Sequence, residues 1–396
     1  WRAAVLNETD VSLAMSSARG DQYVRLPGIR VTVDDVSPTC GVAGVDLALG
    51  GAIEAEIRAR YQLTRLTNRT TPYFANRTNV SGDAGIGGNS QDPANWGPPA
   101  LTFSSGIAGL YDSAPAFTRT QTHLGNLEMY WSHGRHYLTT GGETRRHNVD
   151  IRAQQDPRGS FAFTGAITGY DLADFLLGMP STSAIASGNP DKFPRGWSHA
   201  AYLSDDWRVS PVLTINAGVR WEYESPLTER LNRLVNLDVA PGFTAATPIL
   251  ASHPTGSTTG TAYPSSLLRP DYSGIQPRVA VSWRPVPGSS LLVRGGYGIY
   301  RNTNVYQPIA AQLAQQPPLS NTFSAETSPA SPLTLANGFI ATPSATLNTF
   351  AVDPDFRVGD AHNWQASMQR DLPASLTATI SYLGTKGSHL IQQFLP

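Results

Sequence analysis

The sequence predicts an all-β fold, a transmembrane antiparallel up-and-down β-barrel. Three observations carry this prediction: long strands with one apolar and one polar face, connections that alternate between short and long, and a low content of charged residues. Charged residues make up 15% of the chain, whereas soluble domains contain about 25%. A chain of this length with so little charge is expected to have an apolar outer surface.

The clearest strand covers residues 213–224. Its odd positions are apolar and its even positions are polar or Gly. Because side chains on a strand alternate between faces, this pattern predicts a single strand with one apolar and one polar face. Soluble strands usually run about 5–6 residues, whereas a strand that crosses a membrane at a tilt of about 45° needs about 9–11. The length therefore favours a membrane-spanning strand.

Residues 53–64 repeat this pattern, and their polar face carries charges of both signs. Such a face beside an unbroken apolar face suits a polar lumen and a lipid-facing exterior. The candidate lumen-lining residues are Glu54, Glu56, Arg58, Arg60, Arg220, Glu222, Glu224 and Arg294. For each residue taken singly, a solvated position on any wet barrel wall is the simpler interpretation.

The connections show a second regularity. Gly, Pro and Ser residues predict tight turns at 132–135, 208–211, 285–290 and 371–375. Long polar stretches lie between the hairpins, at 67–122, 149–197, 225–275 and 301–361. Short turns on one rim and long loops on the other are typical of outer-membrane barrels. Shorter alternations at 11–15, 29–33, 127–131, 137–143, 279–283, 291–299, 364–368 and 376–382 bring the predicted total to about 11 strands.

Two further features refine this prediction. The segment 171–180 has apolar residues at helical spacing and ends in Gly and Pro, which predicts a short helix in the second long stretch, with a buried strand as the alternative. Aromatic residues lie mostly near strand ends, where they favour a membrane–water boundary, although aromatics are common in any sheet. These aromatics are Trp207, Trp221, Tyr223, Trp283, Tyr297, Tyr300, Trp364 and Tyr382.

Composition argues against several other classes of protein. The net charge of −1 gives no sign of a nucleic-acid partner. No apolar run approaches the ~18 residues of a membrane helix. The single Cys40 has no partner for an internal disulfide. The chain starts at Trp1 without a signal peptide and stops at Pro396 soon after a strong strand, so we expect a fragment of a longer protein.

The sequence lacks the catalytic motifs that have a defined spacing. It has no His-Glu-x-x-His motif, no Gly-x-Ser-x-Gly elbow and no phosphate-binding loop of the right spacing. His133, His136 and His147 have no nearby carboxylate or Cys to complete a metal site. We therefore predict no catalytic residues, no cofactor and no metal. A β-rich hydrolase with unpatterned carboxylates stays a weaker alternative.

Several short motifs occur in an order that resembles the Oar-like TonB-dependent receptors of Gram-negative bacteria. The resemblance is strong from about residue 120 to the end and weak over the first hundred residues. The motifs begin with Asp156-Pro-Arg-Gly, Leu172-Ala-Asp-Phe, Tyr202-Leu-Ser-Asp-Asp-Trp, Arg220-Trp-Glu-Tyr-Glu, Pro277-Arg, Val293-Arg-Gly-Gly-Tyr-Gly, Asp353-Pro-Asp-Phe and Ser381-Tyr-Leu-Gly.

The resemblance implies a barrel in the cell outer membrane that contacts lipid and passes a bulky, unidentified solute. A TonB-type energy-coupling complex would act on a plug inside it, without bond chemistry. Because a plugged transporter barrel has about 22 strands, we expect residues 1–396 to form one partial barrel domain that lacks the plug, the N-terminal domain and the remaining strands. A secreted or cell-surface β-rich adhesion protein is the alternative, although no repeat period supports it.

Overall fold

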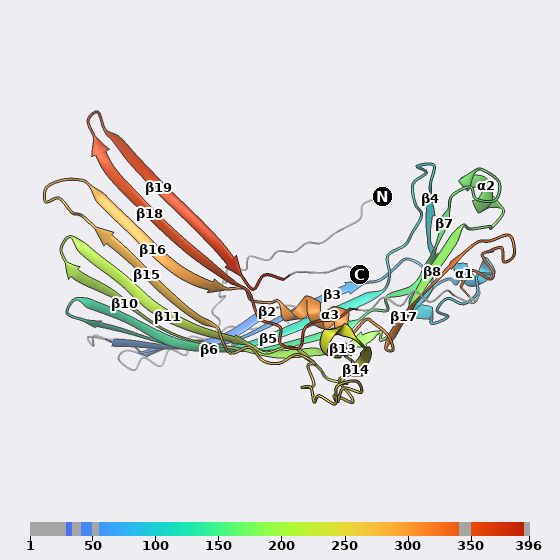
Figure 1. Ribbon diagram of the computed structural model, residues 1–396, viewed down its shortest axis with the longest axis horizontal. Coiled ribbons are helices and arrows are strands. Elements are labelled where there is room, and N and C mark those ends of the chain that lie inside the picture. The colour runs from blue at the N-terminus through green and yellow to red at the C-terminus, as the bar shows by residue number, and fades with distance from the viewer. Residues whose placement is uncertain (1–28, 34–40, 50–54, 340–349, 392–396) are drawn as a thin grey trace.

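The computed structural model describes residues 29–33, 41–49, 55–339 and 350–391. Their largest unit is one antiparallel sheet, and smaller folded units lie beyond one end of its strands (Figure 1). The alternation predicted at 11–15 lies outside the described residues. In the described part of the chain, no helix is both long and apolar enough to span a membrane.

The main path of the sheet holds eleven strands in chain order within the described residues, each antiparallel to the one before it. This arrangement confirms the predicted up-and-down topology. Across the described ranges the sheet ends at β1 and β19 and does not close, as the prediction of an incomplete barrel requires. The eleven strands are β1 (Ile29–Val33), β2 (Gly41–Leu49), β3 (Ala55–Thr70), β5 (Ala116–His133), β6 (His136–Arg152), β10 (Pro194–Ser210), β11 (Leu213–Glu224), β15 (Ile275–Trp283), β16 (Leu292–Arg301), β18 (Asp360–Leu372) and β19 (Leu376–Ser388).

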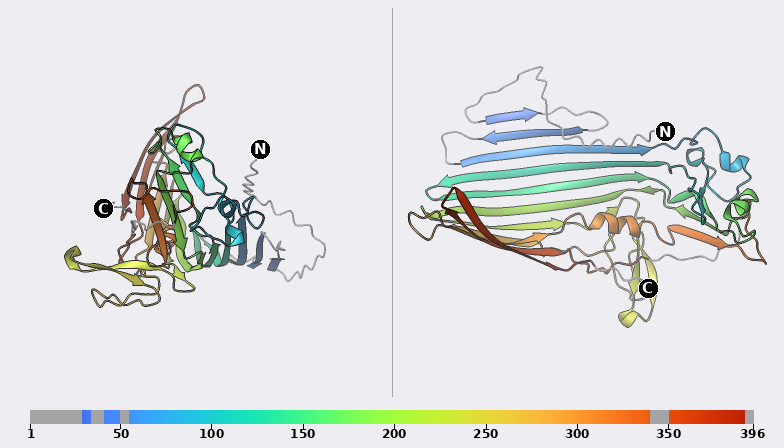
Figure 2. Two further views of the ribbon diagram at one scale, coloured as in Figure 1. Left: turned by 90° about the vertical axis from the view of Figure 1, so that its right-hand side faces the viewer. Right: turned by 90° about the horizontal axis from the view of Figure 1, so that it is seen from above.

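From β3 onward, the connections alternate as predicted. Short turns occupy 134–135, 211–212, 284–291 and 373–375, and long connections occupy 71–115, 153–193, 225–274 and 302–359. Figure 1 shows the short turns at the left and the long connections at the right. We call these two ends of the sheet the short-turn rim and the long-loop rim. Seen end-on, the sheet is curled (Figure 2), as expected for many strands with right-handed twist.

Several details of the strand predictions were wrong. β6 extends to Arg152, well beyond the predicted 137–143. β3 and β5 extend to Thr70 and back to Ala116, well beyond the predicted 53–64 and 127–131. The apolar alternation ends near Leu63, but backbone pairing continues to the Thr70–Ala116 pair. The apolar pattern therefore predicts only the part of a strand that carries it, and not the full length over which the strand pairs. β2 was not predicted, because Gly, Ala and Val occur on both of its alternating sets.

The register places the apolar positions of neighbouring strands on one common face, which we call the apolar face. Val219, for example, lies opposite Leu203 on β10 and Pro277 on β15. Ile57, Leu127, Leu203, Val219 and Val279 are each at least 40% exposed. Because these large apolar side chains have no protein cover, lipid is the environment that suits this face.

Aromatic residues bound the apolar face at both rims. On β10, Trp197 and Trp207 lie ten residues apart, which is about 33 Å along a strand and about 25 Å of membrane thickness at a barrel tilt near 40°. His199 and Tyr223 stack at the boundary near the long-loop rim, which we call the upper boundary. Trp207 stacks on His136 at the boundary near the short-turn rim.

Two of the predicted boundary aromatics lie elsewhere. Tyr300 lies on the opposite face, where Arg278 packs over its ring. Tyr382 lies on the apolar face near the middle of β19, opposite Ala366. Proximity to a predicted strand end was therefore not enough to place these two side chains at a boundary.

The long connections are folded rather than structureless. One unit is a four-stranded sheet of β4 (Ala100–Phe103), β7 (Asp156–Phe163), β8 (Thr182–Gly188) and β17 (Ser320–Glu326). It carries α2 (Asp171–Leu176), which confirms the predicted helix. Phe161 and Phe163 form its buried core. A second unit contains β13 (Val235–Val239), β14 (Ala246–Leu250) and α3 (Tyr306–Leu313), packed around Leu234, Leu267 and Tyr306.

Arg158 joins two long connections that are distant in sequence. Its side chain is 5% exposed and lies 3.4 Å from the Asp112 carboxylate. Its guanidinium also donates to the carbonyl oxygens of Asn95 at 3.0 Å, Trp96 at 2.9 Å and Ser113 at 3.0 Å. It also donates to the Asp112 carbonyl at 3.3 Å. A planar guanidinium presents five donors in a fixed arrangement, so this one side chain satisfies carbonyls from four residues of the 71–115 segment.

We predict that Arg158→Lys loosens the 71–115 segment, because one ammonium group cannot reach the same set of carbonyls. Each buried carbonyl left without a donor costs about 1–3 kcal/mol. Limited proteolysis should then cut within 90–115 at least tenfold faster than in the wild type. Arg357→Lys, at an exposed loop position, is the matched control and should leave the cleavage rate unchanged. Equal cleavage of the two variants would contradict the prediction.

Candidate functional site

The face opposite the apolar face is polar and hollowed. A cavity of about 750 Å³ lies on it, lined by residues from β10 through β19. Its polar lining includes Asp206, Asn216, Arg220, Arg278, Tyr300 and Gln365. The hollow marks this face as the inner side of the curled sheet, and we call it the concave face.

Glu128 on β5 is the first centre of a polar row across the concave face. Its carboxylate accepts hydrogen bonds from the hydroxyls of Tyr202 at 2.7 Å and Tyr130 at 2.8 Å, and from the Asn126 amide at 3.4 Å. Tyr202 belongs to β10, so its ring must cross β6 to reach β5. In register, Gly141 of β6 lies between Glu128 and Tyr202.

Gly141 makes this crossing possible. A Cβ atom at this position would lie 2.7 Å from the Tyr202 hydroxyl oxygen and 2.7 Å from the Leu127 carbonyl oxygen. Both separations are shorter than real Cβ contacts allow. The absence of a side chain at Gly141 therefore lets Tyr202 bridge three strands.

Glu222 on β11 is the second centre of the row. It accepts from Arg220 Nε at 2.6 Å and from Gln276 Nε2 at 2.6 Å. Gln276 is 2% exposed, and its oxygen accepts from the backbone amide of Arg301 at 3.2 Å. A buried amide with both ends bonded fixes its neighbours, so β11, β15 and β16 are held together on this face.

Arginine–tyrosine stacking recurs three times along the row. Arg58 lies 5.1 Å from the ring centre of Tyr130, Arg220 lies 5.6 Å from that of Tyr202, and Arg278 lies 4.5 Å from that of Tyr300. Guanidinium groups over aromatic rings gain from cation–π attraction. Of the row, Tyr202, Arg220, Arg278 and Tyr300 line the cavity itself.

The predicted lumen residues fall into three groups. Arg58, Arg220 and Glu222 belong to the polar row, and Arg60 stands opposite Asn126 on the same face. Glu224 lies at the long-loop rim, where it accepts from the Asn304 amide at 2.9 Å.

The remaining three predicted residues lie apart from the row. Arg294 is exposed on the concave face, between Ser282 and Ser367 in register. Glu56 pairs with Tyr130 through the backbone, and Glu54 lies outside the described residues. That these side chains line a lumen stays a prediction.

Sequence reasoning missed most partners in the row: Asn126, Glu128, Tyr130, Tyr202, Gln276, Arg278 and Tyr300. A usable signal was present on β10, where Tyr202, Ser204 and Asp206 alternate with Leu203 and Trp207. What the sequence lacks is the pairing register between strands, which brings Glu128 and Tyr202 together across Gly141.

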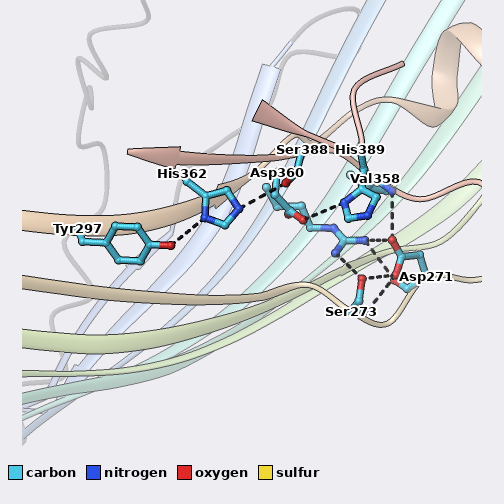
Figure 3. Close-up of polar contacts among 9 residues, drawn as sticks. Asp271, Ser273, Tyr297, Val358, Asp360, His362, Ser388 and His389 are labelled. Carbon is cyan, nitrogen blue, oxygen red and sulfur yellow. Dashed lines mark hydrogen bonds and ion pairs between the residues drawn. The ribbon is translucent and has the colours of Figure 1, made fainter. Parts of the chain in front are cut away.

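A second polar cluster lies at the long-loop rim (Figure 3). Tyr297 contacts His362 Nδ1 at 2.8 Å, and Ser388 contacts the other ring nitrogen at 3.4 Å. Beside them, the guanidinium of Arg301, whose side chain is 2% exposed, bonds Asp271 at 2.7 Å. Asp271 also accepts from the amide of Val358.

These contacts hold a loop carboxylate against the strand ends. Burial alone would raise the pKa of the Asp271 carboxyl, but hydrogen bonds from Ser273 and Val358 and the charge of Arg301 lower it to about 2. Asp271 is therefore ionised at any ordinary pH, and its ion pair ties the third long connection to β16.

Among the described residues, no group of three or more His, Cys, Asp or Glu side chains could hold a metal ion. His133 and His136 flank the turn between β5 and β6, where His136 contacts Asp205 at 2.7 Å. His147 lies on the concave face against Thr122 at 3.2 Å. The three histidines that the sequence offered as ligands are thus divided between opposite faces.

We predict that Gly141→Ala destabilises the sheet by about 1–3 kcal/mol, the usual cost of overpacking, because the new methyl group displaces Tyr202 from Glu128. Gly142→Ala is the matched control. Its Cβ atom would point to the apolar face and meet its nearest neighbour at 3.4 Å. Urea unfolding midpoints of the two variants in one detergent test this difference, and equal midpoints would contradict the bridging role of Tyr202.

The family model described as "Outer membrane beta barrel domain" matches residues 55–395. A search of curated protein sequences finds no match.

Similar solved structures include the copper transporter OprC, with 11% identity over 86% of this chain and 37% of that chain and a TM-score of 0.39. The ferric-catecholate import receptor Fiu from E. coli K12, in its open form, shows 12% identity over 90% and 48%, with a TM-score of 0.36. The Pseudomonas putida toluene transporter TodX shows 9% identity over 87% and 68%, with a TM-score of 0.24.

The chain spans 37% and 48% of the first two structures, and at these identities and TM-scores the likenesses carry no argument about activity. The family match stands independently of them and covers well over half of the chain. It agrees with the two-faced antiparallel sheet and its alternating rims. This chain therefore belongs to the outer membrane beta barrel domain family and is located in the cell outer membrane.

Proposed function

We propose that this chain forms part of the wall of a TonB-dependent outer-membrane transporter of the Oar-like type. The polar row is the observation that carries this proposal. It crosses the concave face from β3 to β16 and offers fixed cations, hydroxyls and amides, whereas the other face of the same strands is apolar. Such a wall suits the passage of a bulky polar solute, without bond chemistry.

The proposed partners follow from the two faces. Outer-membrane lipid covers the apolar face, and a plug and the solute contact the concave face. The energy-coupling complex acts on the plug rather than on this wall. We propose that residues 1–396 are one partial barrel domain, and that Arg60, Glu224 and Arg294 extend the polar lining beyond the row.

Surface binding without transport is the second candidate function. Exposed apolar side chains in the long connections favour it, because Tyr111 is 79% exposed, Tyr170 is 76% exposed and Leu176 is 75% exposed. On a transporter, the same side chains would capture the solute. On an adhesion protein, they would contact another surface.

The assignment of the two faces is tested by a pair of substitutions on β11. Val219→Arg places a charge on the apolar face between the two aromatic boundaries and should destabilise the protein by about 2–4 kcal/mol. Asn216→Arg places the same charge on the concave face, where Asn216 already bonds Asp206, and should have a small effect. Unfolding in lipid bilayers measures both variants, and equal tolerance would contradict the assignment.

Transport is tested by comparing solute uptake in cells with and without the gene, each with and without the energy-coupling protein. Energy-coupled passage predicts that the same solutes fail to enter when either gene is absent. Loss of surface attachment with unchanged uptake would instead favour the adhesion role.

A further inference from the structure

The apolar face changes character above its upper aromatic boundary. On β3, the outward positions run from Ile57 and Tyr61 through Leu63 to Arg65 and Arg69. The pairing continues without interruption through this change. The strands therefore project beyond the lipid-facing band at the long-loop rim, and their outward side chains there become basic.

Besides Arg65, five arginines from four neighbouring strands share this outward position. They are Arg69 on β3, Arg119 on β5, Arg146 and Arg152 on β6, and Arg195 on β10. We call them the outer basic strip. Arg146 pairs in register with both His123 and Trp197 of the upper boundary, so the strip begins directly at that boundary.

Two of the five cations share one carboxylate. Asp150 accepts from Arg119 at 2.5 Å and from Arg195 at 2.6 Å. Asp191 stands opposite Arg152 where β6 pairs with the short strand β9 (Asp191–Lys192). Even with both carboxylates counted, the cations of the strip outnumber them.

The other three arginines are exposed and lie over aromatic rings. Arg146 lies 5.2 Å from the ring centre of Trp197, and Arg69 and Arg152 lie 5.6 Å and 5.8 Å from that of Phe117. In the described part of the chain, no ion pair joins these three guanidinium groups to a carboxylate. Stacking fixes a guanidinium plane while its N–H edges stay free for an anion.

At the opposite rim of the same face, the outward positions are mainly aromatic, and Arg370 on β18 is an isolated outward arginine there. There the outward positions of β5, β10 and β15 are Trp131, Trp207 and Trp283, and the nearby Asp205 is paired with His136. The basic strip is therefore confined to the long-loop side, which in outer-membrane barrels is the extracellular side. It lies at the level of the outer-leaflet headgroups.

We propose that the outer basic strip binds the phosphorylated headgroup of an outer-leaflet lipid, with Arg69, Arg146 and Arg152 as its contacts. Arginine pairs with phosphate through two parallel N–H bonds, and cations at a membrane surface attract anionic headgroups. Because the lipid's acyl chains would lie along the adjoining apolar face, one molecule would satisfy both surfaces. This inference depends on the outer-membrane location and not on transport.

The first test removes the three exposed cations together, as Arg69→Gln, Arg146→Gln and Arg152→Gln. The control removes three exposed arginines near the short-turn rim, as Arg208→Gln, Arg284→Gln and Arg370→Gln. Each protein is purified from outer membranes in neutral detergent, and lipid phosphate per protein is measured after extensive washing. We expect at least a threefold loss for the strip variant and wild-type content for the control. Unchanged content in the strip variant, or equal loss in both, would overturn the proposal.

A second test uses the wild-type protein and so does not depend on the variants folding. The thermal unfolding midpoint is followed while adding a phosphorylated glycolipid, its dephosphorylated form, or inorganic phosphate. The phosphorylated lipid should raise the midpoint by several degrees, and the other two should not. An equal rise with the dephosphorylated lipid would mean acyl-chain contact alone. An equal rise with inorganic phosphate would mean general anion binding, and either result would overturn the proposal.

Discussion

Backbone hydrogen bonding between neighbouring strands is the constraint on which the rest of this structure depends. A bilayer core offers no water to an unpaired amide or carbonyl, so strands that cross it must pair along their whole apolar length. Pairing in a fixed register then decides the face of every side chain, because a slip of one residue exchanges the two faces. From β3 to β19, every apolar alternation lies on one side.

The register also explains the polar row, whose members come from distant parts of the chain. Tyr202 reaches Glu128 only because Gly141 occupies the intervening strand at that level. Glu222 and Gln276 meet because β11 and β15 pair in the register that places them on the same face. The outer basic strip has the same origin, since Arg69, Phe117 and Arg152 are in-register neighbours on three strands. Both surfaces are built from side chains that only the pairing brings together.

Much of the fold could be predicted from local pattern, and much of the site could not. Alternation from Leu213 to Glu224 assigned Arg220 and Glu222 to the polar face, and Gly, Pro and Ser marked each short turn. Local pattern could not show that Phe161 and Phe163 form a core with Ile86, because such contacts join separate long connections. It also ended β3 at the last apolar residue, because the continuing strand carries basic side chains beyond the lipid. Whether a segment forms a strand depends on its own residues. The register between strands and the packing of loops depend on residues that are distant in sequence.

The most direct test of this account is an accessibility scan along β10. With Cys40 replaced, single cysteines at successive positions from His199 to Asp206 would carry a spin label in lipid bilayers. Relaxation by oxygen, which concentrates in lipid, and by a water-soluble nickel chelate measures the exposure of each position. The account predicts alternation with a period of two, with oxygen favoured at Ala201 and Leu203 and the chelate at Tyr202 and Ser204. Similar accessibilities at successive positions would contradict the assignment of one lipid-facing and one water-facing side.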